Sequence, residues 1–252
     1  DLHDLSHLPY RNCCPICVKA KAKEDPHRRK ADGYGEENGL PIISLDYELL
    51  EEKMTMLVAK DNATGCVLSY DCICKGPNDE WVVKQLIKDI ETWGRKDICL
   101  KTDGEPAIVA LQTEVIKQRT ARTVPMNPPA YDPQGNGAAE KAVQDVTAEL
   151  RCLKLALEAR LKCNIDPKHA VVKWMMPHAA FLITRLSKGH DGLTSWRRLM
   201  KRNWSGMLAE FGESVWAKLQ LKKSPVLKKV KRGKKKLIER SIPGVWLGIY
   251  VR

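Results

Sequence analysis

Three apolar, strand-like runs open the main part of the chain, at residues 40–45, 54–59 and 66–74. The third run alternates apolar and polar positions, and a turn-forming sequence, Asp-Asn-Ala-Thr-Gly at 61–65, precedes it. Alternation with short polar connections is typical of strands joined by tight turns. The pattern therefore predicts an antiparallel meander of three strands.

The spacing of apolar positions changes after residue 76. Val82, Leu86, Ile90 and Trp93 recur at helical intervals, behind two candidate capping residues at 78 and 79. The chain then reads as a strand at 97–102, a helix at 106–118, a short strand at 121–125, and long helices at 138–162 and 167–187. This order predicts an α/β core with a mixed five-stranded sheet and helices.

Short strand-like runs return after a break at residues 204–206. They lie at 214–221, 226–230, 236–238 and 245–251, with glycine and proline between and within them. We expect a small C-terminal β-barrel there. The chain thus divides into a His- and Cys-containing module at 1–30, a linker at 31–39, a core at 40–204 and a C-terminal domain at 205–252.

The net charge of +12 is concentrated near the C-terminus. Residues 219–240 hold ten Lys or Arg and one acid, Glu239, so this segment carries +9 and the rest of the chain +3. A basic run attracts polyanions, most often nucleic acid; a solvated tail and a nuclear localisation signal are the alternatives. Its candidate DNA-binding residues are Lys222, Lys223, Lys228, Lys229, Lys231, Arg232, Lys234, Lys235 and Lys236.

Cellular context can be read from the apolar runs and the cysteines. The sequence has no run of about eighteen apolar residues, so we expect no membrane span. It opens with Asp-Leu-His-Asp-Leu and without Met, so no signal peptide is visible, which fits a polyprotein product or a cloned fragment. Six of the nine cysteines are scattered through strand and helix patterns. These six read as buried thiols in a reducing compartment.

The N-terminal module gathers His3, His7, Cys13, Cys14, Cys17 and His27. Cys14 and Cys17 have the spacing of a zinc-ligand pair, and two histidines can complete a tetrahedral site. We predict one zinc ion held by His7, Cys14, Cys17 and His27, with Cys13 as a spare thiol. The alternative is a disordered arm that contains His and Cys but binds no metal.

Three acidic residues stand where predicted elements end or begin. Asp46 follows the first apolar run, Asp103 follows the run at 97–102, and Glu140 lies in the first turn of the helix predicted from 138. Such acids can meet in one pocket, where carboxylates bind Mg²⁺ or Mn²⁺ and two metals serve an in-line phosphoryl transfer. The alternatives are exposed acids, acids that favour a helix dipole, and Asp61 in place of Asp46.

The stretches around these acids are Leu-Asp-Tyr at 45–47, Thr-Asp-Gly-Glu-Pro-Ala at 102–107 and Pro-Pro-Ala-Tyr-Asp-Pro-Gln-Gly-Asn-Gly-Ala-Ala-Glu at 128–140. Together they resemble the integrase of an LTR retrotransposon, closest to the Copia type, in the Asp-Asp-Glu superfamily of retroviral integrases. The likeness continues through 179–185 and 209–216 and spans roughly residues 40–250. The third stretch is the most specific because it fixes Pro, Asn, Gly and Glu together.

The resemblance implies a ribonuclease H-like core and a DNA integrase that trims the 3′ ends of element DNA and joins them to target DNA. It implies two Mg²⁺ or Mn²⁺ ions per active site, with Asp46 bridging both and Asp103 and Glu140 each completing one. Its implied partners are double-stranded DNA (element ends and target), further copies of the chain as a dimer or tetramer, and chromatin. The implied location is the nucleus, with a cytoplasmic particle stage.

The resemblance also bears on residues near the predicted catalytic helix. In the family, the loop that corresponds to 131–137 handles the DNA end, which makes Asn136 a candidate DNA contact; Asn136 also reads as the N-cap of the helix, and the two interpretations are compatible. Gln144 and Arg151 follow Glu140 on nearby helix faces. They are candidates for contact with element DNA or members of a solvent-facing stripe.

Integrases of this superfamily carry a His-His-Cys-Cys zinc module, whose first half His3 and His7 resemble. Only six residues separate His7 from Cys14, far fewer than in the family. The module is therefore either truncated or built on a different ligand set.

Two other functions fit the same pattern. One is a ribonuclease H or another nuclease of that fold, a group that typically uses four carboxylates and lacks the Pro-x-x-Asn-Gly lead-in to a helical Glu. The other is a domesticated derivative that binds DNA without cutting it.

Overall fold

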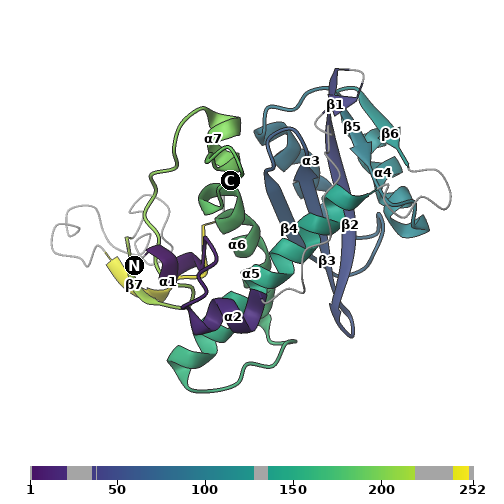
Figure 1. Ribbon diagram of the computed structural model, residues 1–252. Coiled ribbons are helices and arrows are strands. Elements are labelled where there is room, and N and C mark those ends of the chain that lie inside the picture. Colours follow the sequence, from purple (N-terminus) through teal and green to yellow (C-terminus); the bar gives the residue numbers. More distant parts are fainter. Residues whose placement is uncertain (1, 22–35, 38, 128–135, 219–240, 250–252) are drawn as a thin grey trace, which may run out of the picture.

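The computed structural model describes residues 2–21, 36–37, 39–127, 136–218 and 241–249. A mixed sheet with the strand order β4-β3-β2-β5-β6 forms its centre (Figure 1). The strands are β2 (Leu40–Glu51), β3 (Met54–Asp61), β4 (Val67–Cys72), β5 (Ile98–Lys101) and β6 (Thr123–Met126), and a short β1 (Glu36–Glu37) pairs with the start of β2. The predicted mixed five-stranded core sheet is confirmed.

The pairing explains why β2 is the central strand. β2, β3 and β4 form the predicted antiparallel meander. On its other side β2 pairs with β5 in parallel, and β5 pairs with β6 in parallel. Parallel neighbours need long crossovers, and these contain the helices α3 (Glu80–Thr92) and α4 (Pro106–Gln118).

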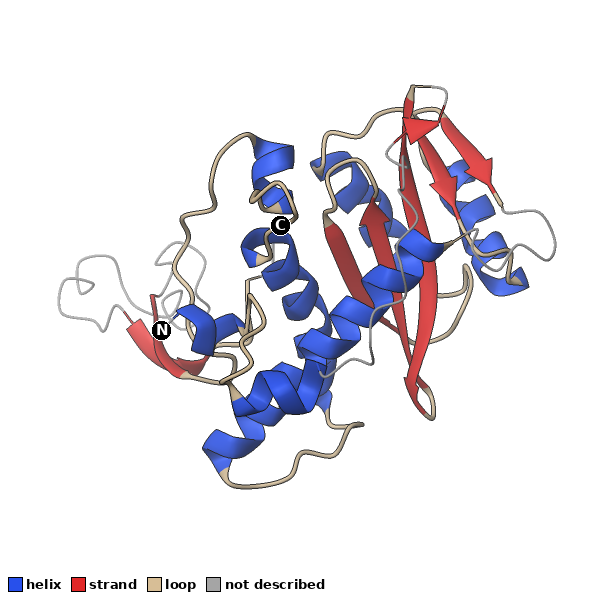
Figure 2. Cartoon of the chain, in the orientation of Figure 1, coloured by secondary structure: helices blue, strands red, loops and turns tan. Residues whose placement is uncertain are grey.

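Helices cover both faces of the sheet (Figure 2). Successive side chains of a strand point to opposite faces. Leu57 of β3 therefore joins the apolar cluster under α3 and α4, whereas its neighbours Met56 and Val58 join the cluster under α5 (Gly137–Leu161) and α6 (Ala170–Leu186). The core thus has three layers, helix, sheet and helix.

The long helices lie close to where the sequence predicts them. Asp79 is the N-cap of α3, and its carboxylate accepts a hydrogen bond from the backbone N–H of Val82 at 3.3 Å. The helices predicted at 106–118, 138–162 and 167–187 correspond to α4, α5 and α6. A short helix, α7 (Ser195–Met200), is additional. None of the described helices has both the length and the apolar character that crossing a membrane requires.

The N-terminal module contains two short helices, α1 (Leu2–Ser6) and α2 (Pro15–Lys21), that the sequence analysis did not predict. Helix α2 lies against α5, so the module is packed on the helical layer of the core (Figure 1). Residues 22–30 of the module and most of the predicted linker at 31–39 fall outside the described residues. Within that linker, Glu36–Glu37 form β1.

The C-terminal part shows a two-stranded antiparallel sheet of β7 (Ser214–Lys218) and β8 (Ser241–Val245), and no barrel within the described residues. The strands predicted at 226–230 and 236–238 lie outside those residues. The strand predicted at 245–251 is wrong over 246–249. There Leu247 and Ile249 pack on the α5–α6 cluster, and Gly248 has a φ of 98° and abuts the ring of His178.

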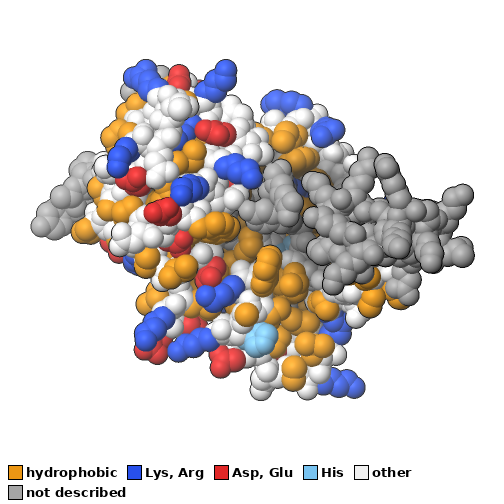
Figure 3. Space-filling view, turned by 180° about the vertical axis from the view of Figure 1, so that it is seen from behind, with side chains coloured by type: hydrophobic (Ala, Val, Ile, Leu, Met, Phe, Trp, Pro, Cys, Tyr) orange, Lys and Arg blue, Asp and Glu red, His pale blue; other side chains and the backbone are white. Residues whose placement is uncertain are grey.

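An apolar groove of about 870 Å³ lies between α3 with β4 and α6 with α7. Its lining includes two aromatic side chains that are half exposed, Trp81 (55%) and Trp174 (52%). Seen from behind, the molecule carries many hydrophobic side chains in the middle and lower part of its face (Figure 3). Contiguous exposed apolar patches often mark contact surfaces.

Candidate active site and metal centre

The strand register brings Asp46 and Asp103 to the same level of the sheet. In the parallel pair of β2 and β5, Ser44 lies opposite Lys101. Asp46 comes two residues after Ser44, and Asp103 comes two residues after Lys101, directly beyond the end of β5. A step of two residues along a strand returns to the same face, so Asp46 is on the face of Ser44. It lies inside β2, which runs to Glu51, and not at the strand end that the sequence predicts. Asp103 is at the same level, just past the end of β5.

Glu140 reaches this same face from α5. Asp46 lies opposite Val58 of β3, and Val58 packs into the cluster under α5, which shows that Asp46 is on the α5 side of the sheet. Glu140 is in the first turn of α5. The ammonium group of Lys60, which lies opposite Ser44 in the sheet, donates a hydrogen bond to the carbonyl of Ala138 at 3.3 Å and holds that turn beside β2.

The charges of Asp103 and Glu140 both act on Asp46. Burial raises the pKa of Asp46 to about 6, and the charge of Asp103 is the next largest cause. The backbone N–H of Tyr47 opposes this shift, while the charge of Glu140 adds to it. Asp46 is half-buried, and Asp103 and Glu140 are exposed. The charges of Asp103 and Glu140 thus both reach Asp46, and we refer to the three residues Asp46, Asp103 and Glu140 as the carboxylate triad.

This site has the donor chemistry of a Mg²⁺ or Mn²⁺ centre, because carboxylate oxygens are the hard ligands these ions prefer. Like-charged neighbours disfavour the ionised form of Asp46, and a bound cation would reverse that effect. A turn fixes Asp103, whose Oδ1 accepts a hydrogen bond from the backbone N–H of Glu105 at 3.0 Å. The donor chemistry of these residues thus suits a divalent cation, although their carboxylate oxygens do not all lie within 4.8 Å of one another.

Asp61, the alternative to Asp46, has a structural role. It is fully buried, and its Oδ2 pairs with the Arg95 guanidinium at 2.7 Å. The same oxygen accepts a hydrogen bond from the Thr64 hydroxyl at 2.6 Å, and Oδ1 accepts one from the backbone N–H of Ala63 at 3.1 Å. These contacts stabilise the turn after β3.

Asn136 occupies the N-cap position of α5, but its side chain makes no capping hydrogen bond. Its Nδ2 instead donates to the backbone carbonyl of Leu45 at 2.9 Å, and the residue is 3% exposed. Asn136 is therefore the N-cap residue by position, as predicted, but its side chain does not cap: capping would use Oδ1 as an acceptor, and Oδ1 has no partner among the described residues. The rest of the predicted DNA-end loop, residues 128–135, lies outside the described part of the chain.

The remaining candidate DNA contacts have different surroundings. Gln144 is exposed on α5. Arg151 is also exposed, but its Nη1 donates to the carbonyl of Ala20 at 2.8 Å and so links α5 to α2. The nine basic candidates between 222 and 236 lie outside the described residues.

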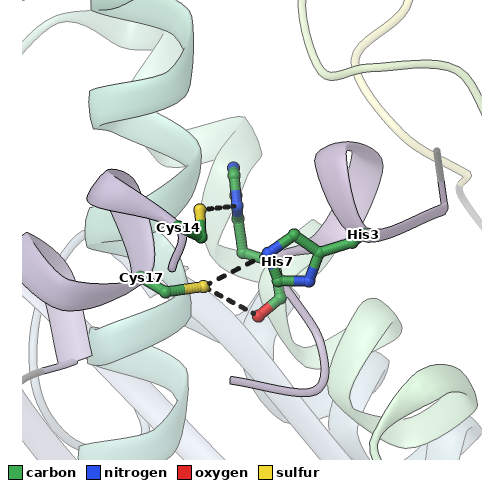
Figure 4. Close-up of side chains that lie close together, drawn as sticks. All are labelled: His3, His7, Cys14 and Cys17. Carbon is green, nitrogen blue, oxygen red and sulfur yellow. Dashed lines mark hydrogen bonds between the residues drawn. The ribbon is translucent and has the colours of Figure 1, made fainter. Parts of the chain in front are cut away.

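The N-terminal module brings four potential metal ligands together: His3, His7, Cys14 and Cys17 (Figure 4). One ligand atom from each lies within 4.8 Å of all the others, and no other group of described residues meets this criterion. The thiol of Cys17 lies 3.5 Å from Nε2 of His3, and the thiol of Cys14 lies 3.6 Å from Nδ1 of His7. Two nitrogens and two sulfurs are a donor set that zinc takes in structural sites.

This His-Cys cluster contains three of the four predicted zinc ligands. His27 lies outside the described residues, and the group is complete without it because His3 supplies the second nitrogen. The sequence offered a signal for this: His3 and His7 are four residues apart and thus one helical turn apart. The chain reverses between α1 and α2, which carries Cys14 and Cys17 back to both histidines.

Burial shifts the pKa values of His7 and Cys17 in opposite directions, and only the shift of His7 favours metal binding. Burial and the neighbouring His3 lower the pKa of His7 to about 4, so its imidazole is neutral at pH 7 and able to act as a ligand. Burial raises the pKa of the Cys17 thiol. Zinc ligation needs the thiolate, and the charge of a bound zinc ion supplies the stabilisation that burial removes.

Comparison with known proteins shows similarity at the level of structure. No protein-family model matches the chain. No curated protein matches it either. Among solved structures, the chain is similar to one in the cryo-EM structure of the simian T-cell lymphotropic virus intasome in complex with PP2A regulatory subunit B56 gamma.

That similarity has a TM-score of 0.50 and 17% sequence identity, and it covers 92% of this chain and 76% of the other. Identity this low is informative about the fold alone. The described sheet and helices are compatible with a ribonuclease H-like core. The chain therefore shares its fold with a component of a retroviral intasome.

Proposed function

We propose that this chain is the integrase of a Copia-type LTR retrotransposon, a DNA polynucleotidyl transferase of the Asp-Asp-Glu type. The observation that carries the proposal is the carboxylate triad, in which the charges of Asp103 and Glu140 both raise the pKa of Asp46. The integrase-like motifs around these residues support it. So does the fold shared with a retroviral intasome chain.

Each acid has a role in this proposal. Asp46, on the central strand β2, would be a ligand shared by two divalent cations, and Asp103 and Glu140 would each supply a further ligand. The cations supply Lewis-acid chemistry that activates the attacking oxygen and stabilises the leaving oxygen. In 3′-end processing the attacking oxygen belongs to water. In strand transfer it belongs to the 3′-hydroxyl of element DNA, which displaces a 3′ oxygen of the target strand.

A strand-transfer assay with the element's own terminal DNA tests this function. We expect joined products with Mg²⁺, none with chelator, and none from Glu140→Gln, which keeps DNA binding because it removes a metal ligand and no positive charge. The matched control is Glu91→Gln, the same change at an exposed acid on α3, on the opposite face of the sheet. Full activity of Glu140→Gln would overturn the proposal. If the wild-type protein binds DNA but produces no joined products, the chain is instead the domesticated derivative that binds DNA without cutting it.

A ribonuclease H-like nuclease is the second candidate, and one observation favours it. Glu48 lies two residues after Asp46 on β2, and its charge also raises the pKa of Asp46, so four carboxylates influence this site. The test is cleavage of an RNA–DNA hybrid. Loss of cleavage in Glu48→Gln without loss of strand transfer assigns Glu48 to a nuclease reaction.

The partners follow from the same proposal. Double-stranded DNA, both element ends and target, is the substrate, and the basic run at 219–240 is its sequence-independent contact. The chain works as a homo-oligomer, and the apolar groove with Trp81 and Trp174 at its surface is the described region best suited to contact a second copy. Serine at both positions should lower the sedimentation coefficient. Nuclear action on chromatin after a cytoplasmic particle stage completes the proposal.

A further inference from the structure

Lys21, the last residue of α2, joins the His-Cys cluster to α5. Its ammonium group donates a hydrogen bond to the backbone carbonyl of His7 at 3.0 Å and forms an ion pair with the carboxylate of Glu149. Glu149 is fully buried within α5, and Lys21 is the only partner found for its carboxylate among the described residues. One side chain thus contacts both a metal ligand and the catalytic helix.

A second contact fixes the same junction. Nη1 of Arg151 donates to the carbonyl of Ala20 at 2.8 Å, one residue before Lys21. Glu149 follows Glu140 by nine residues, which is about two and a half helical turns. The two glutamates therefore lie on opposite sides of α5. Glu140 is on the side of β2 and Asp46, and Glu149 is on the side of α2.

The energetics make this junction depend on the module. A buried carboxylate is strongly unfavourable without a partner, and losing one member of a buried ion pair destabilises a protein far more than replacing both by apolar residues. Lys21 can meet Glu149 only while α2 and the carbonyl of His7 hold it in place. Their arrangement depends in turn on the His-Cys cluster, whose ligands come from both sides of the α1–α2 reversal.

We infer that Lys21 and Glu149 are positioning residues, which couple metal loading of the His-Cys cluster to the placement of α5 and hence of Glu140. In this arrangement the N-terminal module supports the catalytic helix of its own chain. The consequence for catalysis rests on the proposed function. The coupling between metal and core stability does not.

The test uses the full chain, loaded with zinc or stripped by a zinc-selective chelator at constant Mg²⁺. In the wild type, stripping should lower the Tm of the core and speed amide hydrogen exchange in residues 140–152. Lys21→Met should keep zinc but lower Tm by about 10 °C, because Glu149 stays buried without its partner. Lys21→Met combined with Glu149→Leu should recover most of that loss and show a much smaller effect of chelator on Tm and exchange.

The matched control is Lys154→Met, which removes a partly exposed pair with Glu158 (Nζ to Oε1 2.6 Å) on the same helix. It should leave the effect of chelator unchanged. Equal chelator effects in the wild type and the double variant would overturn the inference, since metal would then act on the core by another route. If Glu140→Gln abolishes strand transfer in that case, the proposed function stands and only the coupling fails. If no strand transfer is found, the Tm and exchange results still decide the coupling.

Discussion

Asn136 donates a hydrogen bond from Nδ2 to the carbonyl of Leu45 at 2.9 Å, across 91 positions of sequence. Leu45 is the residue before Asp46 on β2, and Asn136 lies four residues before Glu140 at the start of α5. A single buried contact therefore sets the distance between the strand that carries one acid and the helix that carries another. This makes Asn136 a positioning residue of the proposed active site.

Asn136→Ala should destabilise the protein by about 1–3 kcal/mol, because the buried carbonyl of Leu45 loses its donor. Strand transfer should fall, while affinity for DNA should stay unchanged. Chemical denaturation and fluorescence anisotropy with terminal DNA measure the two effects. Asn136→Asp keeps the shape but sets a carboxylate oxygen against the Leu45 carbonyl in a buried position, so it should lose at least as much stability as Asn136→Ala. Weaker DNA binding at unchanged stability would instead make Asn136 a DNA contact.

The zinc ligand set can be decided by substitution. Purified protein should contain about one zinc per chain, and His3→Ala or Cys14→Ser should release it, because each removes one of four clustered ligands. His27→Ala should keep the metal. Elemental analysis after gel filtration is the measurement. Retention of zinc in His3→Ala together with its loss in His27→Ala would restore the set that the sequence alone favoured.

His178 on α6 should give the protein a measurable acid sensitivity. The ring is 2% exposed, stacks on Phe181 with centroids 5.8 Å apart, and has no hydrogen-bond partner at either nitrogen among the residues that the structure describes. Burial lowers its pKa to about 4. Between about pH 6.5 and pH 4 the unfolded chain binds a proton at His178, whereas the folded chain keeps this ring neutral. The contribution of His178 to the free energy of unfolding is therefore fully present above about pH 6.5 and is lost as pH falls toward 4.

The gap between these two pKa values corresponds to about 3 kcal/mol of unfolding free energy. Between pH 7 and pH 4 the free energy of unfolding should therefore fall by about 3 kcal/mol less in His178→Leu than in the wild type. This difference does not depend on how stable the variant is at pH 7. Urea unfolding at several pH values measures this difference. His190→Gln, at an exposed histidine, should keep the wild-type profile. Parallel profiles for wild type and His178→Leu would contradict the prediction.

The sequence predicts those parts of the fold that repeat over many residues. Alternation and helical spacing place the meander and the helices α3 to α6 because each buries a long apolar face. Asp103 and Glu140 lie at element ends as the sequence predicts, whereas Asp46 lies inside β2, because that strand continues to Glu51 beyond its apolar run. These inferences need no knowledge of contacts between distant residues.

Elements that depend on tertiary contacts are missed. Helices α1 and α2 have five and seven residues, too short to be stable alone. Spacing alone favoured His27 over His3, because the reversal of the chain after α1 is a tertiary feature. Likewise, the buried acceptor of Asn136 and the pairing of Lys21 with Glu149 leave no periodic pattern.

The two described residues that flank the basic run lie side by side. Lys218 at the end of β7 pairs with Ser241 at the start of β8. We predict that this segment binds DNA through phosphates, without reading sequence. Phosphate neutralisation releases counterions, so affinity should fall steeply with salt, and scrambled DNA should bind about as well as element DNA.

Substitution of six lysines tests this prediction quantitatively. The variant replaces Lys228, Lys229, Lys231, Lys234, Lys235 and Lys236 with Gln. If all six meet phosphates, the slope of log affinity against log salt should become shallower by about five. The same six positions changed to Arg keep the charge and should keep the slope. An unchanged slope in the Gln variant would leave import or solvation as the role of the run, because phosphate contact cannot survive the loss of these charges without a change in counterion release.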